Sequence, residues 1–311
     1  MITLSLTDAV NQACAAVDIE PPTRRLVPDF WVRTDTKGKN GKGDGSVKLD
    51  VDLKGGTAMN YQTGLHQRFR LGVASNDNRP VDPQTAAKRR ERERQIEAER
   101  REVERICAAI VAGCREDRHA YFDKKGFPEE VGLVCDDPCP LFPKDRFGEA
   151  LARALPDAQG KPLLIIPGRI GSKIVTVQFI TVTGEKKNIL KGQMGGAFHR
   201  IATGRDTWVC EGIGTALTVR AALKVLGANA TVLSAFSASN VGKVAEAIAG
   251  ARIAADHDKP VETLENRGAG EFYARRSGRK FVMPPEPGDW NDHHMKHGLR
   301  SVALLLREAL G

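Results

Sequence analysis

Three kinds of segment are missing from this sequence of 311 residues. No apolar run approaches the roughly 18 residues that a membrane helix needs. The N-terminal stretch MITLSLTDAV lacks the basic region and long apolar core of a secretory signal. A dense set of cysteines is also missing, because only six are scattered along this long chain, which fits free thiols in a reducing compartment rather than a disulfide scaffold. We therefore expect a cytoplasmic protein with no membrane partner.

Aromatic residues are also scarce, at 5% of the sequence, so the core is expected to be mainly aliphatic. Positive charge, in contrast, is in excess: 47 Lys and Arg against 39 Asp and Glu give a net charge of +8. Residues 22–72 contain ten Lys or Arg and five Asp, and so supply +5 of that total. A concentrated basic segment favours an anionic partner.

The basic segment has the pattern of a small antiparallel sheet, preceded by an amphipathic helix at 6–18. FWVRT (30–34), TAMNY (57–61) and QRFRL (67–71) are expected to be strands. SVKLDVDL (46–53) alternates apolar and polar residues, which predicts one half-buried strand over its whole length. Gly55-Gly56 is interpreted as a turn.

Aromatic residues alternate with Lys and Arg in this sheet, a pattern that suits single-stranded DNA because bases stack on rings and cations meet phosphates. The candidate DNA-binding residues are Trp31, Arg33, Lys48, Arg68 and Arg70. In QRFRL, Arg68 and Arg70 are expected to face opposite to Phe69. The alternative, in which the aromatic residues are only the core of the sheet, stays open.

A polar stretch with two prolines, SNDNRPVDP (75–83), predicts a linker, and residues 84–118 predict a long charged helix. The first part of this helix is polar on all sides, as in solvated helices held by pairs such as Glu97–Arg101. Its last turns carry an apolar stripe, which we expect to dock on the next domain.

From residue 162 onward the pattern is α/β. PLLIIPGRI (162–170) and KIVTVQFI (173–180) predict a hairpin that 186–192 and 197–201 continue. Strands are then expected at 207–212, 230–236, 252–258 and 280–285, and helices at 215–226, 241–249, 265–278 and 298–310. Such alternation predicts a parallel sheet with crossover helices.

Acidic residues follow three of these expected parallel strands. Glu211 ends the first, Asp256 and Asp258 end the third, and Asp289 and Asp292 follow the fourth. Because ligands of open parallel sheets sit at the carboxyl ends of the strands, we expect these carboxylates to meet. Carboxylates gathered in this way repel each other unless a cation holds them, and oxygen ligands suit Mg²⁺ or Mn²⁺. A strand-terminal Asp that only caps a helix or forms a turn is the alternative.

The ordered acids resemble the Toprim domain of bacterial-type primases, and most closely the Toprim primases of phages, plasmids and integrative elements. The resemblance rests on VCEGIGTALTV (209–219), IAADHD (253–258) and PPEPGDWND (284–292), and extends upstream through 175–201 and HAYFDKKGF (119–127). It implies a Toprim-like doubly wound parallel sheet with preceding antiparallel strands. The expected domains are a basic β-rich domain (1–74), a linker and charged helix (75–118), the N-terminal part of the primase core (119–205) and the Toprim domain (206–311).

The resemblance also implies roles. Glu211, Asp256 and Asp258 would be catalytic metal ligands, with Asp289 and Asp292 completing the acidic set. Nucleotide or phosphate contacts would come from Lys187, Lys191, Gly212 and Asn240, although a plain helix cap is the alternative for Asn240. Members of this group often carry a cysteine zinc ribbon, which this chain lacks. We expect no zinc site, and interpret His293 and His297 as polar surface residues and Cys135 and Cys139 as free thiols.

The expected function is a DNA primase-like nucleotidyltransferase that makes short primers from NTPs on a single-stranded DNA template, with Mg²⁺ or Mn²⁺, for phage or plasmid replication. No Walker-type GxxxxGK[ST] motif is present, so helicase activity is expected from a separate partner. Two alternatives stay open: a Toprim-type metal-dependent nuclease, and a non-catalytic DNA-binding replication accessory. Three tyrosines in a chain of this length disfavour a topoisomerase.

Overall fold

The computed structural model describes residues 5–71 and 83–308. The chain divides into two compact units, the first formed by 1–96 with 261–266 and the second by 97–260 with 267–311. The expected linker at 75–83 lies almost entirely outside the described residues. Helix α2 (Pro83–Ala112) runs from the first unit into the second. Among the described residues, no helix combines the length and apolar character needed to cross a membrane.

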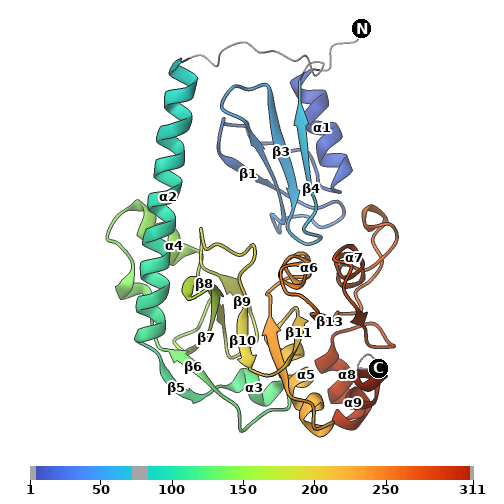
Figure 1. The fold of residues 1–311 in the computed structure, drawn as a ribbon. Coiled ribbons are helices and arrows are strands. Elements are labelled where there is room, and N and C mark those ends of the chain that lie inside the picture. The colour runs from blue at the N-terminus through green and yellow to red at the C-terminus, as the bar shows by residue number, and fades with distance from the viewer. Residues whose placement is uncertain (1–4, 72–82, 309–311) are drawn as a thin grey trace. The chain divides into compact units, whose positions relative to one another are not determined.

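The first unit is built on an antiparallel sheet of four strands in the order β1-β2-β3-β4 (Figure 1). The strands are β1 (Trp31–Thr34), β2 (Gly45–Leu49), β3 (Gly55–Asn60) and β4 (His66–Arg70). Helix α1 (Leu6–Ala16) begins with a capping box between Ser5 and Asp8 and buries its apolar face against one side of the sheet. The core of this unit is therefore one-sided, which leaves the other face of the sheet free of α1.

Two expectations for the first unit are wrong. The strand predicted at 46–53 ends at Leu49, and Val51 and Leu53 are 38% and 47% exposed in a turn in which Leu53 has φ +56°. Asp50 and Asp52 supply side chains that favour this turn over continued alternation. Gly55 and Gly56, predicted as a turn, lie inside β3, where a Cβ on Gly56 would be 2.6 Å from the Phe69 ring.

The second unit begins with the end of α2, whose Val103, Ile106, Cys107 and Ile110 are buried against an antiparallel sheet, as predicted. This sheet has the order β5-β6-β7-β8-β9. Its strands are β5 (Arg115–Arg118), β6 (Val131–Cys135), β7 (Leu163–Ile170), β8 (Lys173–Ile180) and β9 (Lys186–Asn188). The hairpin β7–β8 is confirmed, but the predicted helix stops at Ala112, because Gly113 interrupts it and Arg115–Arg118 pairs with β6.

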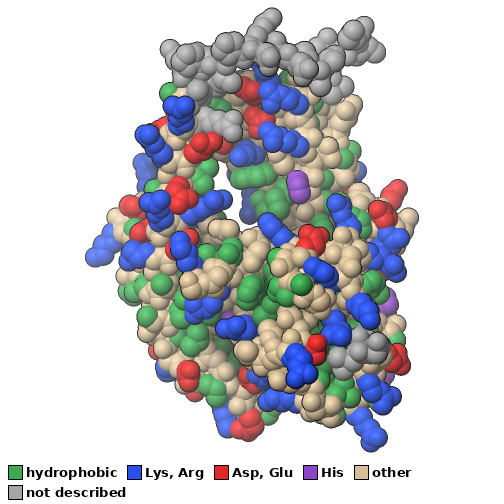
Figure 2. Space-filling view, viewed as in Figure 1, with side chains coloured by type: hydrophobic (Ala, Val, Ile, Leu, Met, Phe, Trp, Pro, Cys, Tyr) green, Lys and Arg blue, Asp and Glu red, His purple; other side chains and the backbone are tan. Residues whose placement is uncertain are grey.

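Helices flank this sheet at three points along the chain. They are α3 (Ala120–Lys124), the short 3-10 helix Cys139–Leu141 and α4 (Arg146–Arg153). The polar surface of α2 carries ion pairs between successive turns, such as Glu97–Arg101 at 3.1 Å. Figure 2 shows acidic and basic side chains interspersed on the left side of the view. The expected i,i+4 pairing is thus confirmed.

The second sheet of this unit has the order β10-β12-β11-β13-β14. The strands β11 (Asp206–Cys210), β12 (Ala230–Ser234), β13 (Arg252–Ala254) and β14 (Phe281–Val282) are parallel, and β10 (His199–Ala202) is antiparallel to β12. The expectation that 197–201 continues the β7–β8 hairpin is therefore wrong for the strand itself. A bridge between Phe198 and Arg169 and a contact of His199 Nδ1 with Pro167 O at 3.0 Å link this segment to β7.

Helices cover both faces of the parallel sheet, because alternate strand residues are apolar in both directions. Trp208 and Cys210 face α5 (Ile213–Val225), α8 (Trp290–His297) and α9 (Leu299–Glu308). Val209 faces α6 (Ala238–Glu246) and α7 (Ala269–Arg276). The fold of this unit is mixed α/β, with parallel and antiparallel sheets. Helix α8 was not predicted, because the preceding PPEPGD reads as a loop.

Candidate active site and nucleic-acid interface

The candidate active site lies where the chain reverses its direction across the parallel sheet. From β11 the chain crosses to β12 on one side, then returns to β13 on the other. Glu211 follows β11 and Asp256 follows β13, so both side chains start from the carboxyl ends of adjacent strands. In doubly wound sheets this switch point is where ligands bind.

A pocket of about 160 Å³ opens at this point, and we call it the carboxylate pocket. It contains three of the five predicted acids, namely Glu211, Asp256 and Asp289. The site is composite, because Gln178 and Lys186 come from the antiparallel sheet. The remaining lining residues are Tyr121, Gly212, Gly214, Thr215 and Phe236.

Burial and the crowding of the acids raise the pKa of two of them, Glu211 and Asp256. Burial, followed by repulsion from Asp258 and Asp289, raises the pKa of Glu211 to about 7, while Lys186 acts in the opposite direction. Burial and the neighbouring carboxylates, Glu211 first, also raise the pKa of Asp256, against the hydrogen bond that Thr215 Oγ1 donates to Asp256 Oδ1 at 3.2 Å. Like charges this close favour the protonated form unless a cation joins them.

Asp289 is held in the pocket by the N-terminus of α8. Its Oδ1 accepts from the Asp292 amide at 2.7 Å, and Asp292 Oδ2 accepts from the Asp289 amide at 3.2 Å, which is a capping box. Two reciprocal backbone bonds between His257 and Gly288 tie this segment to the end of β13. Trp290 Nε1 also donates to Ala255 O at 3.1 Å.

Glu211 is fixed through its carbonyl oxygen. Phe236 N donates to this oxygen at 2.7 Å and Ser234 Oγ at 3.1 Å. Phe236 has φ +71°, a left-handed conformation that is unfavourable for a bulky side chain. The backbone strain at Phe236 thus lies directly beside the candidate catalytic carboxylate.

Two of the predicted acids do not line the carboxylate pocket. Asp258 is exposed, and its Oδ2 accepts from Gly270 N at 2.8 Å at the start of α7. It acts on the pocket through its charge, which contributes to the raised pKa of Glu211 and Asp256. Asp292 is exposed and is engaged in the capping box with Asp289.

Lys187 and Lys191 are the predicted phosphate contacts, but the lysine that lines the carboxylate pocket is Lys186. Lys187 is exposed and pairs with Glu185 at 3.5 Å, and Lys191 pairs with Glu99 at 2.9 Å. Lys186 lies in the pocket, with its Nζ 5.6 Å from the Tyr121 ring centre. Strand alternation could have separated these two lysines, because the side chains of Lys186 and Lys187 project to opposite faces of β9.

Gly212 and Asn240 have different surroundings. Gly212 is the N-cap residue of α5 and lines the pocket, so the positive end of this helix faces the site. Asn240 is buried inside α6, which begins at Ala238, so it is not the cap. Its two amide hydrogens go to Ala197 O and Ala235 O, and its oxygen accepts from Gly196 N, which leaves no donor for a phosphate.

The residues of the carboxylate pocket fit a hard divalent cation by their chemistry. Among residues 5–71 and 83–308, no three His, Cys, Asp or Glu side chains converge closely enough to enclose a metal ion by themselves. Mg²⁺ does not require such a cage, since it usually keeps several waters and binds through one or two carboxylates and the substrate phosphates. Glu211, Asp256 and Asp289 supply oxygen ligands of this type.

His293 is buried, contrary to the expectation of a surface residue, and Cys135 and Cys139 are free thiols. His293 Nε2 lies 2.9 Å from Ser301 Oγ, and the rings of His293 and His297 are 4.6 Å apart between centres. Cys135 is buried and Cys139 is exposed, with burial as the main cause of a raised pKa for both thiols. A raised pKa keeps a thiol protonated and poorly reactive.

The five predicted DNA-binding residues lie on one face of the sheet in the first unit. The register pairs Trp31 with Lys48, Lys48 with Thr57 and Thr57 with Arg68, which forms one row across four strands. Arg33 and Arg70 are two residues along from this row and therefore share its face. Phe69 faces α1 instead, so the predicted alternation in QRFRL is confirmed. We call this surface the outer sheet face.

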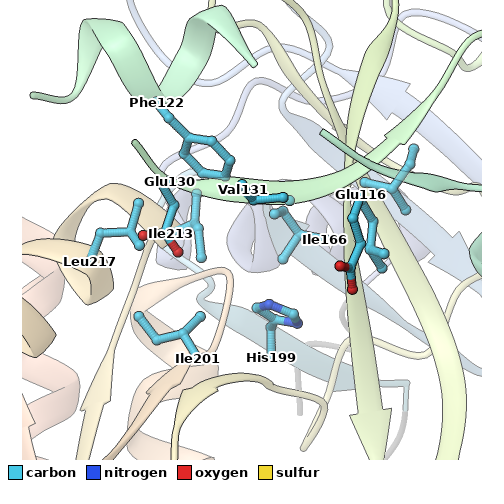
Figure 3. Close-up of a pocket in the computed structure, with 12 residues that line it drawn as sticks. Glu116, Phe122, Glu130, Val131, Ile166, His199, Ile201, Ile213 and Leu217 are labelled. Atoms are coloured by element: carbon cyan, nitrogen blue, oxygen red, sulfur yellow. The ribbon is translucent and has the colours of Figure 1, made fainter. Parts of the chain in front are cut away.

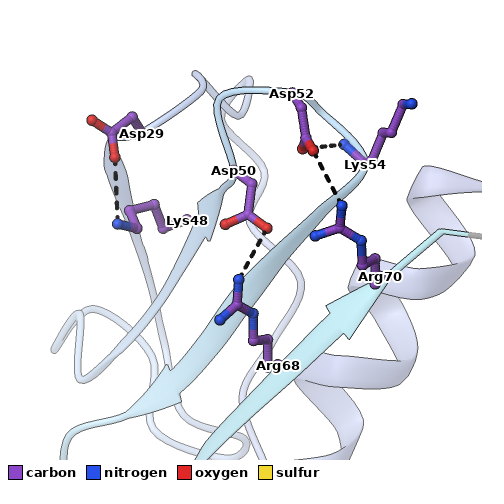
Figure 4. Close-up of polar contacts among 7 residues, drawn as sticks. All are labelled: Asp29, Lys48, Asp50, Asp52, Lys54, Arg68 and Arg70. Carbon is purple, nitrogen blue, oxygen red and sulfur yellow. Dashed lines mark hydrogen bonds and ion pairs between the residues drawn. The ribbon is translucent and has the colours of Figure 1, made fainter. Parts of the chain in front are cut away.

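Acidic residues accompany the cations of the outer sheet face. Lys48 pairs with Asp29 at 3.4 Å, Arg68 with Asp50 at 3.7 Å and Arg70 with Asp52 at 3.5 Å (Figure 4). Trp31 is 43% exposed, with Lys48 Nζ 5.6 Å from its ring centre. Arg33 stacks on Tyr61 at 4.2 Å. The face thus presents a row of rings and cations, of which part is neutralised.

No protein-family model matches the sequence, and no curated protein matches it. Two solved structures resemble it. The primase fragment of the bacteriophage T7 primase-helicase protein is 17% identical with a TM-score of 0.36, over 51% of this chain and 70% of that fragment. The Aquifex aeolicus primase (zinc-binding and RNA polymerase domains) is 12% identical with a TM-score of 0.39, over 97% and 84%. Both TM-scores are too low to indicate a function for this chain.

Proposed function

We propose that the chain is a Toprim-type primase that joins nucleotides on a single-stranded DNA template. The observation that carries this proposal is the meeting of Glu211, Asp256 and Asp289 with Lys186 in one pocket at the switch point of a parallel sheet. Buried, crowded carboxylates beside a lysine and a helix N-terminus favour a ligand that combines divalent cation and phosphate.

Each group of the pocket has a part in phosphodiester formation. A bound Mg²⁺ or Mn²⁺ supplies charge neutralisation at the phosphate oxygens. Glu211, with its pKa raised to about 7, is suited to accept the proton of the attacking 3′-hydroxyl near neutral pH. The 3′-oxygen then bonds to the α-phosphorus while the bond to pyrophosphate breaks. Lys186 and the backbone at Gly212 hold the negative charge of the triphosphate.

The outer sheet face is proposed to hold the template. Trp31 supplies a ring on which a base stacks, and the cations beside it meet the backbone phosphates. The phage or plasmid context, the separate helicase and the domain boundaries at 74, 118 and 205 stay predictions from the sequence.

Primer synthesis from labelled NTPs on single-stranded DNA, with Mg²⁺ or Mn²⁺, tests the proposal. We expect short labelled oligonucleotides that require both template and cation, and their loss in Asp256→Ala. The matched control is Asp206→Asn, an acid at the opposite end of β11 that pairs with Arg252 on the surface. Shortening of the DNA without incorporation would instead assign the pocket to a nuclease, and neither reaction would leave a DNA-binding accessory.

A further inference from the structure

A second cavity, of about 250 Å³, lies in the second unit and has no part in the proposed reaction. In Figure 3, Phe122 and Val131 lie on one side of the hollow, and Ile201 and His199 lie on the opposite side. We call it the His199 pocket. Its lining is mainly apolar and comes from β5, α3, β6, β7, β10 and α5.

The ring of His199 presents a hydrogen-bond acceptor to this cavity. His199 Nδ1 lies 3.0 Å from Pro167 O, and because a carbonyl oxygen only accepts, Nδ1 carries the hydrogen. Burial lowers the pKa of His199 to about 4, so the ring is neutral at neutral pH. Nε2 therefore keeps a lone pair, and no described residue donates to it.

The two carboxylates at the His199 pocket differ in their partners. Glu130 is occupied by the guanidinium of Arg220, which donates to both of its oxygens. The Glu116 carboxylate makes no hydrogen bond or ion pair with another described residue, and it points toward the side of the cavity that carries His199 (Figure 3). The free polar atoms of this cavity are thus acceptors, which require donors on a ligand.

Size and charge restrict the ligand further. Pockets for drug-sized molecules have about 300–1,000 Å³, so this cavity suits a smaller body of one or two fused rings. The rings of Phe122 and His199 on opposite sides favour a flat aromatic ligand between them. The unpaired carboxylate of Glu116 repels a phosphate group, so the ligand is uncharged or cationic rather than a nucleotide.

We propose that the His199 pocket binds a planar, purine-sized heterocycle with N–H donors and no phosphate. The ring would lie among the apolar side chains, with its N–H groups directed at His199 Nε2 and the Glu116 carboxylate. Ile213 and Leu217 of α5 line this pocket, and α5 begins beside Glu211. Phe122 lines it while its neighbour Tyr121 lines the carboxylate pocket. A ligand here would therefore contact α3 and α5, two of the elements that line the carboxylate pocket.

The test is a titration of the full chain with 2-aminopurine, whose fluorescence reports stacking. We expect saturable quenching, about tenfold weaker binding in Glu116→Gln because a charge-assisted hydrogen bond is lost, and no binding in Ile201→Phe, which fills the cavity. Glu149→Gln, an exposed acid on α4 outside the cavity, is the matched control and should bind normally. If Ile201→Phe does not fold, Glu116→Gln, a surface substitution, still decides.

Three results would overturn the inference: no saturable signal, equal affinity in Glu116→Gln and the unchanged chain, or equal affinity for the 5′-monophosphate of 2-aminopurine riboside. Loss of binding in Glu211→Gln would also overturn it, because the ligand would then occupy the carboxylate pocket. The measurement does not depend on primer synthesis, so the inference stands or fails separately from the proposed function.

Discussion

The outer sheet face and the carboxylate pocket use acidic residues in opposite ways. On the sheet, Asp50 and Asp52 each pair with one cation, and Asp29 pairs with both Lys48 and Arg92. In the pocket, Glu211, Asp256 and Asp289 lie with Lys186, and burial together with neighbouring carboxylates raises the pKa of Glu211 and of Asp256. Exposed pairs contribute little to stability and are easily exchanged for another partner. Crowded acids, in contrast, are retained at a cost in stability, which points to a ligand that relieves it.

The largest effect is expected when one acid of the pocket is removed. Asp256→Ala or Glu211→Gln should lower primer synthesis by about 10²–10³-fold or more, because charge stabilisation in the transition state is lost. Steady-state incorporation of labelled NTPs measures this, and circular dichroism checks the fold. Synthesis within a few-fold of the unchanged chain would contradict the site assignment.

Adjacent lysines of β9 provide a matched pair for the next effect. Lys186→Ala should lower synthesis by about 10–100-fold and shift the pH profile upward, because Lys186 holds down the pKa of Glu211. Lys187→Ala, one residue further and outside the pocket, should leave both nearly unchanged. Equal losses in the two variants would show that the pocket lysine has no special part.

A smaller effect is expected on the outer sheet face. Trp31→Ala should weaken single-stranded DNA binding by about tenfold, through the loss of base stacking, as measured by fluorescence anisotropy. Val51→Ala, an exposed apolar residue in the turn after β2, is the control. Asp50→Asn should strengthen binding a few-fold at low salt, because Arg68 is released from its pair. Unchanged affinity in both Trp31→Ala and Asp50→Asn would assign the face to another partner.

The smallest effect is on stability. Because the pKa of Glu211 is raised from 4.5 to about 7, its neutral form favours the fold at low pH, and this contribution is lost as the pH rises through about 7. The melting temperature of the metal-free chain should therefore fall by a few degrees between pH 5 and pH 8, since about 1 kcal/mol corresponds to roughly 2–4 °C. Glu211→Gln should reduce this fall, and Mg²⁺ should reverse it at pH 8 but not at pH 5. A flat profile in calorimetry would argue against crowded carboxylates.

The sequence allowed the acids to be placed but not the cation beside them. Glu211, Asp256 and Asp289 follow strands whose parallel order the βα alternation predicts, so their meeting could be inferred. Lys186 comes from the other sheet, and packing between two sheets has no signature in local periodicity. The contact of Thr215 with Asp256 could not be predicted either, because a Thr in the first turn of a helix has no pattern that indicates such a partner.

Tertiary contacts also explain the errors in the fold. Gly56 looked like a turn residue, but it serves the close approach of the Phe69 ring. Residues 197–201 looked like a continuation of the hairpin, but β10 pairs with β12 of the other sheet. Helix α8 had a local signal, the spacing of Asp289 and Asp292 as a capping box, which was interpreted only as two metal ligands.

Asp289 has a consequence for how the chain would respond to cation loading. One of its oxygens accepts the Asp292 amide at the start of α8, while its side chain lines the carboxylate pocket. A cation that binds this carboxylate would therefore also change the hydrogen bonding of the first turn of α8. This helix packs on α5 and α9 in the same core. Amide hydrogen exchange of that turn would then act as a built-in gauge of pocket occupancy, readable without substrate or turnover.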